Sequence, residues 1–268
     1  MAHAPHATRF AHRAPIRLGP VTISPSFLRA VILGSTVLFL AAWSQRDALP
    51  APERLAAVIF DEPLQKPTDR DAFRTTVGGI EYTVRPLYSY DLSGLIVSKH
   101  NADSWWDWIH KAAHDRLNVT DLCVVWGTNA RSGVYRELDF SSGEFVCYVQ
   151  TSSDAVWSAF DMAALSNNHL LTDDPATARL LRDVRVGDQV HFRGYLAEYS
   201  HHHEFNFFRG TSTTRTDTGN GACETVFTTE VEVLRSGNRG WRIAFWGAAA
   251  ALVAAVIAWL TVPMRVTD

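Results

Sequence analysis

Two long apolar runs stand near the ends of this chain. Residues 243–262 contain no charged side chain, and tryptophans flank the run at Trp241 and Trp259. A helix needs about 20 such residues to cross the hydrocarbon core of a bilayer, and tryptophan favours its interfaces. Residues 27–44 form a second run, with Arg29 in its first turn. The pattern predicts a transmembrane helix in each run; a cleaved signal peptide is the alternative for 27–44.

These two runs divide the chain. The predicted order is an N-terminal tail over 1–26, a helix over 27–44, a linker over 45–75, a globular β-rich domain over 76–236, a second helix over 243–262 and a tail over 263–268. The linker is predicted because prolines interrupt a stretch of mixed charge. A short helix is predicted within it, over 54–60.

Inside the domain, the hydrophobic pattern alternates between the periods of strands and of helices. A period of two, or a short apolar run, predicts strands. Capping residues and helical composition predict helices. The predicted strands are 88–97, 121–127, 189–199, 205–214 and 225–234, and the predicted helices are 104–117, 154–165 and 175–184.

Glycine positions in this pattern bear on the fold class. Gly94 and Gly194 each interrupt an alternating strand, as glycines do where strands bend to close a barrel. The domain is therefore predicted to be mixed but mainly β. The expected architecture is a small OB-like or SH3-like barrel with helical insertions, flanked by two transmembrane helices.

Charge and cysteine content narrow the possibilities. A net charge of −3 gives no basic signal for nucleic acid, so no nucleic-acid partner is predicted. The cysteines are too few for a disulfide framework, although Cys123 and Cys147 are a plausible pair that would leave Cys223 free. The favoured interpretation is that all of them are buried thiols, because free cysteine usually packs as a small core residue.

Arginines around the first helix predict its orientation. More of them precede it than follow it: Arg9, Arg13, Arg17 and Arg29 against Arg46 and Arg54. The positive-inside rule then places the N-terminus in the cytoplasm and the domain outside it. The second helix gives the opposite signal, with Arg235, Arg239 and Arg242 on the domain side against Arg265. Since the first helix usually dominates, the prediction is a two-pass inner-membrane protein with a periplasmic domain.

The segments DLCVVWG, LSNNHLL, VGDQVHFRG and STTRTDTGNGACE together resemble an uncharacterised family of bacterial membrane-anchored proteins. Its motifs are SNNH, GDxVxFxG and TRxDTGxGACE, and the resemblance covers roughly residues 88–230. It implies the same plan of flanking helices and a middle domain, but no established activity. It assigns these residues to motifs: Asn168, His169, Asp188, Arg215, Asp217, Cys223 and Glu224.

Several polar groups are candidates for chemistry. Cys223 with His169 as base would suit a thiol hydrolase, with Asn168 or Asp217 orienting the base. The alternative is that Asn167 and Asn168 end a helix and that Cys223 begins a strand. The run His201–His203 would suit a metal or haem, although neighbouring side chains of a strand face opposite sides. Arg215, Asp217 and Glu224 are expected to form a charge network that fixes a turn or lines a ligand pocket.

Tryptophans mark one further segment. Trp105 and Trp108 are three residues apart in the predicted helix 104–117, so they share one of its sides. That side packs in the core or binds the membrane or a partner.

The leading hypothesis is a membrane-tethered extracytoplasmic binding or scaffold domain without catalysis and without a cofactor. Its partners are predicted to be the lipid bilayer and a membrane protein. The candidate ligand-binding residues are Asn168, His169, Arg215, Asp217, Cys223 and Glu224. The alternatives are a thiol hydrolase using Cys223 and His169, and metal or haem binding through His201–His203.

Overall fold

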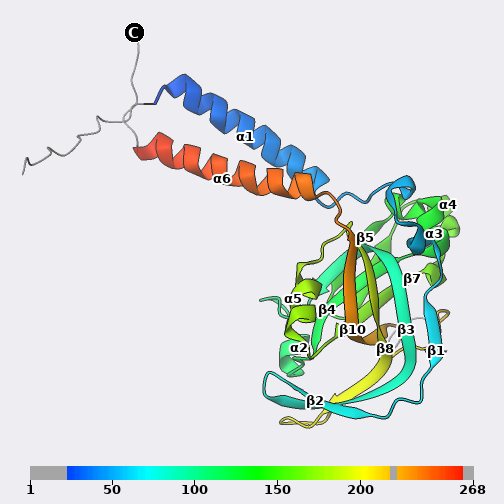
Figure 1. The fold of residues 1–268 in the computed structure, drawn as a ribbon. Helices are drawn as coiled ribbons and strands as arrows, with labels where there is room; N and C mark the ends of the chain where they lie inside the picture. The colour runs from blue at the N-terminus through cyan, green and yellow to red at the C-terminus, as the bar shows by residue number, and fades with distance from the viewer. Residues whose placement is uncertain (1–22, 218–221, 262–268) are drawn as a thin grey trace, which may run out of the picture. The chain divides into compact units, whose positions relative to one another are not determined.

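The computed structural model describes residues 23–217 and 222–261, and the chain divides into two compact units. One unit holds most of the helices α1 (Pro25–Gln45) and α6 (Arg239–Thr261), and the other spans residues 42–243 (Figure 1). Both helices are long and apolar enough to cross a membrane. They contact each other through the rings of Phe39 and Phe245, whose centroids are 4.7 Å apart. The two predicted apolar helices are therefore confirmed as helices.

The domain is built on a ring of strand pairings. β3 pairs with β4 and β4 with β7, both antiparallel; β7 pairs with β10 in parallel; β10 pairs with β8 and β8 with β3, again antiparallel. The strands are β3 (Ile80–Asn101), β4 (Asn118–Val125), β7 (Leu165–Leu171), β8 (Gln189–His201) and β10 (Glu224–Arg235). The β3–β8 pairing joins the two ends of the path, so β3 and β8 each have a neighbour on both sides.

Shorter elements extend and cover this ring. β1 (Leu64–Pro67) and β2 (Phe73–Val77) pair with β3, and β9 (Phe207–Arg209) pairs with β8. β5 (Asp139–Gly143) and β6 (Val146–Gln150) form a separate hairpin inserted between β4 and β7. The α-helices are α2 (Ile109–Ala112), α3 (Gly127–Ser132), α4 (Asp154–Ala159) and α5 (Pro175–Asp183), and the 3₁₀ helices are Pro52–Arg54, Ala57–Phe60, Val134–Glu137 and Met162–Ala164.

Alternation along the strands feeds different cores. In β4, Leu122 and Val124 belong to one cluster with residues of β3, β8, β10 and α5. Their neighbours Cys123 and Val125 belong to a second cluster, with residues of α3 and of the 3₁₀ helices Ala57–Phe60 and Val134–Glu137. Successive residues of a strand point to opposite faces of the sheet. A strand that is apolar on both faces, such as β4, must therefore be covered on both sides. The β5–β6 hairpin supplies part of that cover.

The two glycines singled out by the sequence lie where strands approach closely. A side chain at Gly94 would collide with Val124, and one at Gly194 would collide with the backbone of Phe227. Glycine is therefore required at both positions. The mainly β, mixed fold is confirmed.

Several predicted elements differ from the structure. The helix predicted over 104–117 is wrong: only Ile109–Ala112 is helical, and a turn precedes it. The helix predicted over 154–165 ends at Ala159. The strand predicted over 205–214 is reduced to Phe207–Arg209. In each case local composition was a weaker influence than the tertiary contacts of the segment.

The largest difference is at 165–171, which is the strand β7 and not a helix end. It pairs with both β4 and β10, and six of its seven residues are buried. The Asn168 amide donates to the carbonyl of Leu122, so this polar residue is accommodated inside the sheet. The predicted linker 45–75 also contributes structure, since β1 and part of β2 lie in it.

Candidate functional site

A buried histidine and a buried aspartate face each other across β4 and β7. The strand register places Asp121 opposite His169, and His169 Nδ1 lies 2.7 Å from Asp121 Oδ1. Arg209 of β9 donates to His169 Nε2 over 2.5 Å. The ring therefore accepts at Nε2 and donates from Nδ1. Burial raises the pKa of Asp121, but His169 outweighs it and brings that pKa to about 2.

The β5–β6 hairpin closes over this group. A disulfide joins Cys123 to Cys147, with 5.9 Å between their Cα atoms, and leaves Cys223 free. At the hairpin turn, the backbone N–H of Phe145 donates to Asp121 Oδ2 over 3.2 Å. The Arg209 guanidinium carbon lies 3.9 Å from the centre of the Phe145 ring. The disulfide therefore holds an aromatic residue against the Asp121 group.

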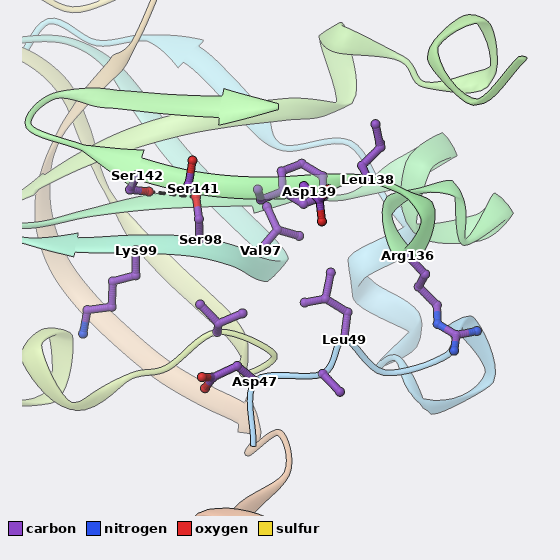
Figure 2. A pocket seen from close by; sticks show the side chains of 13 residues that line it. Asp47, Leu49, Val97, Ser98, Lys99, Arg136, Leu138, Asp139, Ser141 and Ser142 are labelled. Atoms are coloured by element: carbon purple, nitrogen blue, oxygen red, sulfur yellow. Dashed lines mark hydrogen bonds between the residues drawn. The ribbon is translucent and has the colours of Figure 1, made fainter. Parts of the chain in front are cut away.

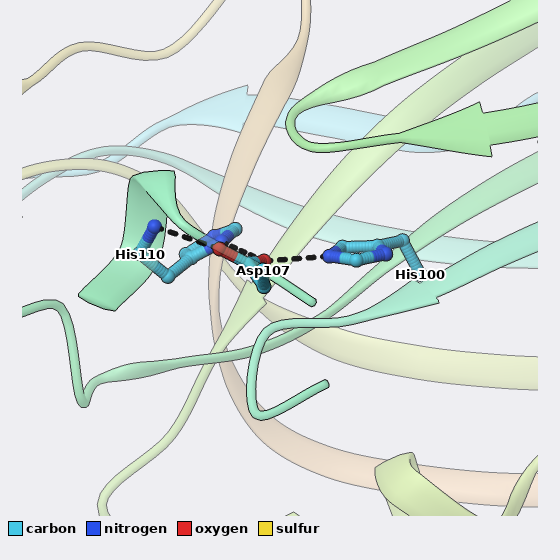
Figure 3. A group of neighbouring side chains, drawn as sticks. All are labelled: His100, Asp107 and His110. Atoms are coloured by element: carbon cyan, nitrogen blue, oxygen red, sulfur yellow. Dashed lines mark hydrogen bonds and ion pairs between the residues drawn. The ribbon is translucent and has the colours of Figure 1, made fainter. Parts of the chain in front are cut away.

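A second buried carboxylate lies in the connection between β3 and β4 (Figure 3). Asp107 Oδ2 is 2.6 Å from both His100 Nε2 and His110 Nδ1. The other oxygen, Oδ1, accepts the backbone N–H of His110 over 2.9 Å. All three side chains are almost completely buried. Burial raises the pKa of Asp107, but these hydrogen bonds outweigh it and hold that pKa below its usual value.

One asparagine connects the two carboxylate groups. The Asn118 amide donates to His110 Nε2 over 2.8 Å and to Asp121 Oδ1 over 3.0 Å. Neither aspartate is among the site residues predicted from the sequence. The available signal was the Asp-x-x-His spacing at 107–110, because residues three apart meet on one side of a helical turn.

Cys223 directly precedes β10, and its partners are separate from those of His169. Cys223 Sγ lies 3.6 Å from the Asn167 amide nitrogen and 3.7 Å from the carbonyl oxygen of Phe145. Burial raises the pKa of the Cys223 thiol. Both ring nitrogens of His169 are hydrogen-bonded, to Asp121 and to Arg209. In this arrangement, His169 has no free nitrogen to accept a proton from a nucleophile.

The remaining predicted residues lie elsewhere. Glu224 is opposite Asn168 in the parallel β7–β10 register, and Ser166 donates to its carboxylate over 2.5 Å. Burial raises the pKa of Glu224 to about 7. Arg215 lies over the Trp126 ring and donates to the carbonyl of Pro63. Asp217 accepts from Ser212 over 2.7 Å, so it stabilises the turn that contains it.

The histidine run 201–203 has separate partners. His201 Nε2 lies 2.8 Å from the carbonyl oxygen of Ala113, and its Nδ1 accepts the backbone N–H of His203. His202 Nδ1 lies 2.7 Å from the side-chain oxygen of Asn206. The rings therefore do not converge on one point.

An open pocket lies beside the chain segment that follows α1 (Figure 2). Its volume is about 570 Å³, and its lining includes Leu49, Lys99, Arg136 and Ser142. The Lys99 ammonium donates to the carbonyls of Leu181, Arg182 and Val184, at the end of α5. Burial lowers the pKa of Lys99 to about 7. Because its donors are used by these carbonyls, Lys99 serves mainly to end α5.

The two chain segments that lead to the terminal helices meet at Arg242, whose guanidinium is bonded to Asp188. Asp188 Oδ1 accepts the backbone N–H of Gly237 over 2.8 Å and the Arg242 guanidinium over 3.1 Å. The same guanidinium donates to the carbonyl of Arg46, and Asn238 donates to that of Ala48. The residue after α1 and the start of α6 are therefore fastened at one place in the domain.

Tryptophans stand exposed next to the Asp107 group. Trp105 and Trp108 are 87% and 76% exposed, and they lie in the turn before α2 and not on the face of a long helix. Trp106 packs instead against the His100 ring, with 4.6 Å between centroids. The backbone N–H of Trp108 donates to the Glu144 carboxylate at the hairpin turn.

A comparison with protein-family models, with curated proteins and with solved structures found no match to this chain. The resemblance to an uncharacterised family of bacterial membrane-anchored proteins therefore stays a prediction.

Proposed function

We propose that this chain is a two-pass protein of the bacterial inner membrane whose middle domain is extracytoplasmic and binds a membrane-protein partner without catalysis. Two helices of sufficient length and apolarity support the anchoring. The bonds of Arg242 to Asp188 and to the carbonyl of Arg46 support tethering at both ends, because they bring the two connections to the helices together at one place in the domain.

The disulfide supports the extracytoplasmic side. Cys123–Cys147 is a structural disulfide that ties the inserted hairpin to β4. Such bonds persist in oxidising compartments and are rare in the cytoplasm of mesophiles. A membrane-impermeant protease added to intact spheroplasts is expected to degrade the domain. Protection of the domain until the membrane is lysed would place it in the cytoplasm instead.

We further propose that the ring of strand pairings is an OB-like barrel. A single ring of five strands with one parallel pair supports this proposal. OB domains bind their ligands on the face of the second and third strands and with the loop between the first two. In this chain those strands are β4 and β7, which carry Asp121 and His169, and that loop carries the exposed tryptophans.

The observation that carries the binding function is the exposure of Trp105 and Trp108 in this loop. Tryptophan is among the residues that contribute most to binding energy at protein interfaces. A hydrogen bond from Trp108 to Glu144 joins the loop to the disulfide-bonded hairpin, so the rings stand on a supported surface. We propose that this surface contacts the partner.

The test is affinity purification of the full-length protein in mild detergent, read by mass spectrometry. The wild type is compared with the double variant Trp105→Ala/Trp108→Ala and with Trp157→Ala. Trp157 is a matched control, since it is 48% exposed but belongs to α4. We expect the wild type and the control to recover a partner in an amount near that of the protein itself. We expect the double variant to recover at least tenfold less of that partner.

Two results would contradict the binding proposal. If the wild type is recovered without any other protein in a near-equal amount, no stable partner exists. Equal recovery from the double variant would move the contact away from the tryptophans. Loss of binding to protein-free anionic vesicles in the double variant alone would assign the surface to lipid instead.

The thiol hydrolase and the His201–His203 metal site receive less support. The Cys223 pKa is raised, and the His169 nitrogens are occupied by Asp121 and Arg209. The rings at 201–203 have unrelated partners.

A further inference from the structure

We propose that His100, Asp107 and His110 form a binding site for one transition-metal ion, with Zn²⁺ as the representative ion. This inference is independent of the proposed partner binding. It rests on the geometry of three side chains from one short segment and on the charge that they bury.

The ligand atoms are of the right kind and close together. His100 Nε2, Asp107 Oδ2 and His110 Nδ1 lie within 4.8 Å of one another. Zn²⁺ takes imidazole nitrogen and carboxylate oxygen at about 2.0–2.2 Å, which separates tetrahedral ligands by roughly 3.3 Å. Each imidazole nitrogen now lies 2.6 Å from the carboxylate oxygen, so each must withdraw by roughly 0.7 Å to admit an ion.

The charge of the group favours a cation. Asp107 is completely buried, and two imidazoles share one of its oxygens. Among the ion pairs within 23–217 and 222–261, no lysine or arginine is paired with Asp107. The nearby Lys111 ammonium instead donates to the carbonyls of Ser104 and Trp105. Hydrogen bonds from His100 and His110 stabilise this buried carboxylate but leave it with a net negative charge, which a bound dication would neutralise.

The surroundings hold both rings in place. Trp106 packs on His100, and the Phe145 ring lies 4.0 Å from that of His110. Ligating histidines are commonly oriented by such neighbours and by a hydrogen bond at the other ring nitrogen. For His110 that neighbour is the Asn118 amide, whose own oxygen is buried without a hydrogen-bond partner.

Metal binding requires a change of tautomer. Each neutral imidazole keeps one proton, which moves to Nδ1 of His100 and to Nε2 of His110 when the opposite nitrogen binds the ion. The Asn118 amide then turns its unpartnered oxygen toward His110 Nε2. The amide nitrogen also donates to Asp121, so ion binding at one carboxylate weakens one hydrogen bond at the other. Three protein ligands leave a coordination position open for water or an added ligand.

The test uses full-length protein in mild detergent, stripped with EDTA and titrated with Zn²⁺ alone or with Co²⁺. We expect one ion per chain, a visible Co²⁺ absorption band in the range of nitrogen and oxygen ligation, and a rise in the unfolding temperature on adding Zn²⁺. Asp107→Asn and, separately, His110→Gln are expected to weaken Zn²⁺ binding at least 100-fold.

The matched control is His202→Gln/His203→Gln, which alters exposed histidines outside the group. It is expected to bind Zn²⁺ as the wild type does. Absence of stoichiometric Zn²⁺ and Co²⁺ binding in folded wild-type protein would overturn the proposal. So would wild-type affinity in folded Asp107→Asn or His110→Gln, particularly if the control variant lost it. Using two separate ligand variants keeps the test decisive if one of them fails to fold.

Discussion

The two buried carboxylates of this domain, Asp107 and Asp121, are both hydrogen-bonded to histidine. They differ in whether a positively charged side chain lies behind that histidine. Each accepts a hydrogen bond from at least one histidine at 2.6–2.7 Å. Behind Asp121, however, His169 is hydrogen-bonded to Arg209, which supplies a positive charge. Behind Asp107 there is a second histidine. The same residue types therefore form a closed structural network around Asp121 and a candidate cation site around Asp107.

The positions of the two groups in the fold match this difference. Asp121 and His169 are held by strand register, with the disulfide-bonded hairpin above them. Asp107 lies in a loop, with His110 at the start of a single helical turn. A group held by a sheet ladder is rigid, whereas Asp107 and His110 lie outside the ladder and can move away from His100 of β3 by the distance that an ion requires.

The largest expected effect comes from removing each carboxylate in EDTA. Asp121→Asn removes the fully buried carboxylate partner of His169, to which Arg209 is bonded, and should lower the free energy of unfolding by about 3–5 kcal/mol. Asp107→Asn weakens the hydrogen bonds to two histidines but leaves no lysine or arginine without its partner, and should cost only about 1–2 kcal/mol. Urea unfolding followed by tryptophan fluorescence measures both. Equal costs would contradict the difference in compensation.

The hairpin is expected to matter almost as much. Replacing both Cys123 and Cys147 by serine opens a loop whose ends are 24 residues apart. The free energy of unfolding should fall by about 3 kcal/mol. Since Phe145 contacts both His110 and His169, amide hydrogen exchange should rise in β4 and in 107–112 together. Faster exchange at only one of them would show that the hairpin supports a single group. Cys223→Ser, which breaks no disulfide, is the control.

Glu224 is a third buried carboxylate and should act through pH. Its pKa is raised by burial from an ordinary 4.5 to about 7. The folded state therefore holds this proton more tightly than the unfolded state, and stability falls as the pH rises from about 4.5 through 7. Glu224→Gln should match wild type at pH 5 and exceed it by about 2 kcal/mol at pH 8. A constant difference between the two pH values would exclude ionisation of Glu224 as the cause.

The smallest effect is expected at the surface. Arg85 and Glu198 form an ion pair across β3 and β8, with the arginine 61% exposed. Glu198→Gln should change the free energy of unfolding by less than about 1 kcal/mol, and less still at 1 M salt. A larger loss of stability in Glu198→Gln would mean that burial does not explain why Asp121 contributes more than a surface ion pair.

Local signals in the sequence determined part of this fold. Apolar runs predicted the terminal helices, because the length and apolarity of a membrane-spanning helix can be read from the local sequence alone. Capping residues predicted the helix over 175–184. In the structure α5 begins at Pro175, and the Asp174 side chain caps it by accepting the backbone N–H of Thr177. Alternation predicted the strands around residues 88–97 and 225–234. Gly94 and Gly194 were predicted to lie at bends of a barrel, and in the structure they lie where strands approach closely.

The remainder depended on tertiary structure. LSNNHLL has no alternation of apolar residues and became a central strand because β4 and β10 lie on either side of it. His169 was a sequence candidate, but its partners Asp121 and Arg209, 48 and 40 residues away, came from strand register. Asp107 lies in the predicted helix 104–117 and carried no signal of its own, and only the fold buried it between two histidines. Pairing and burial are long-range properties, so the sequence named some of the residues and only the tertiary structure decided which of them meet.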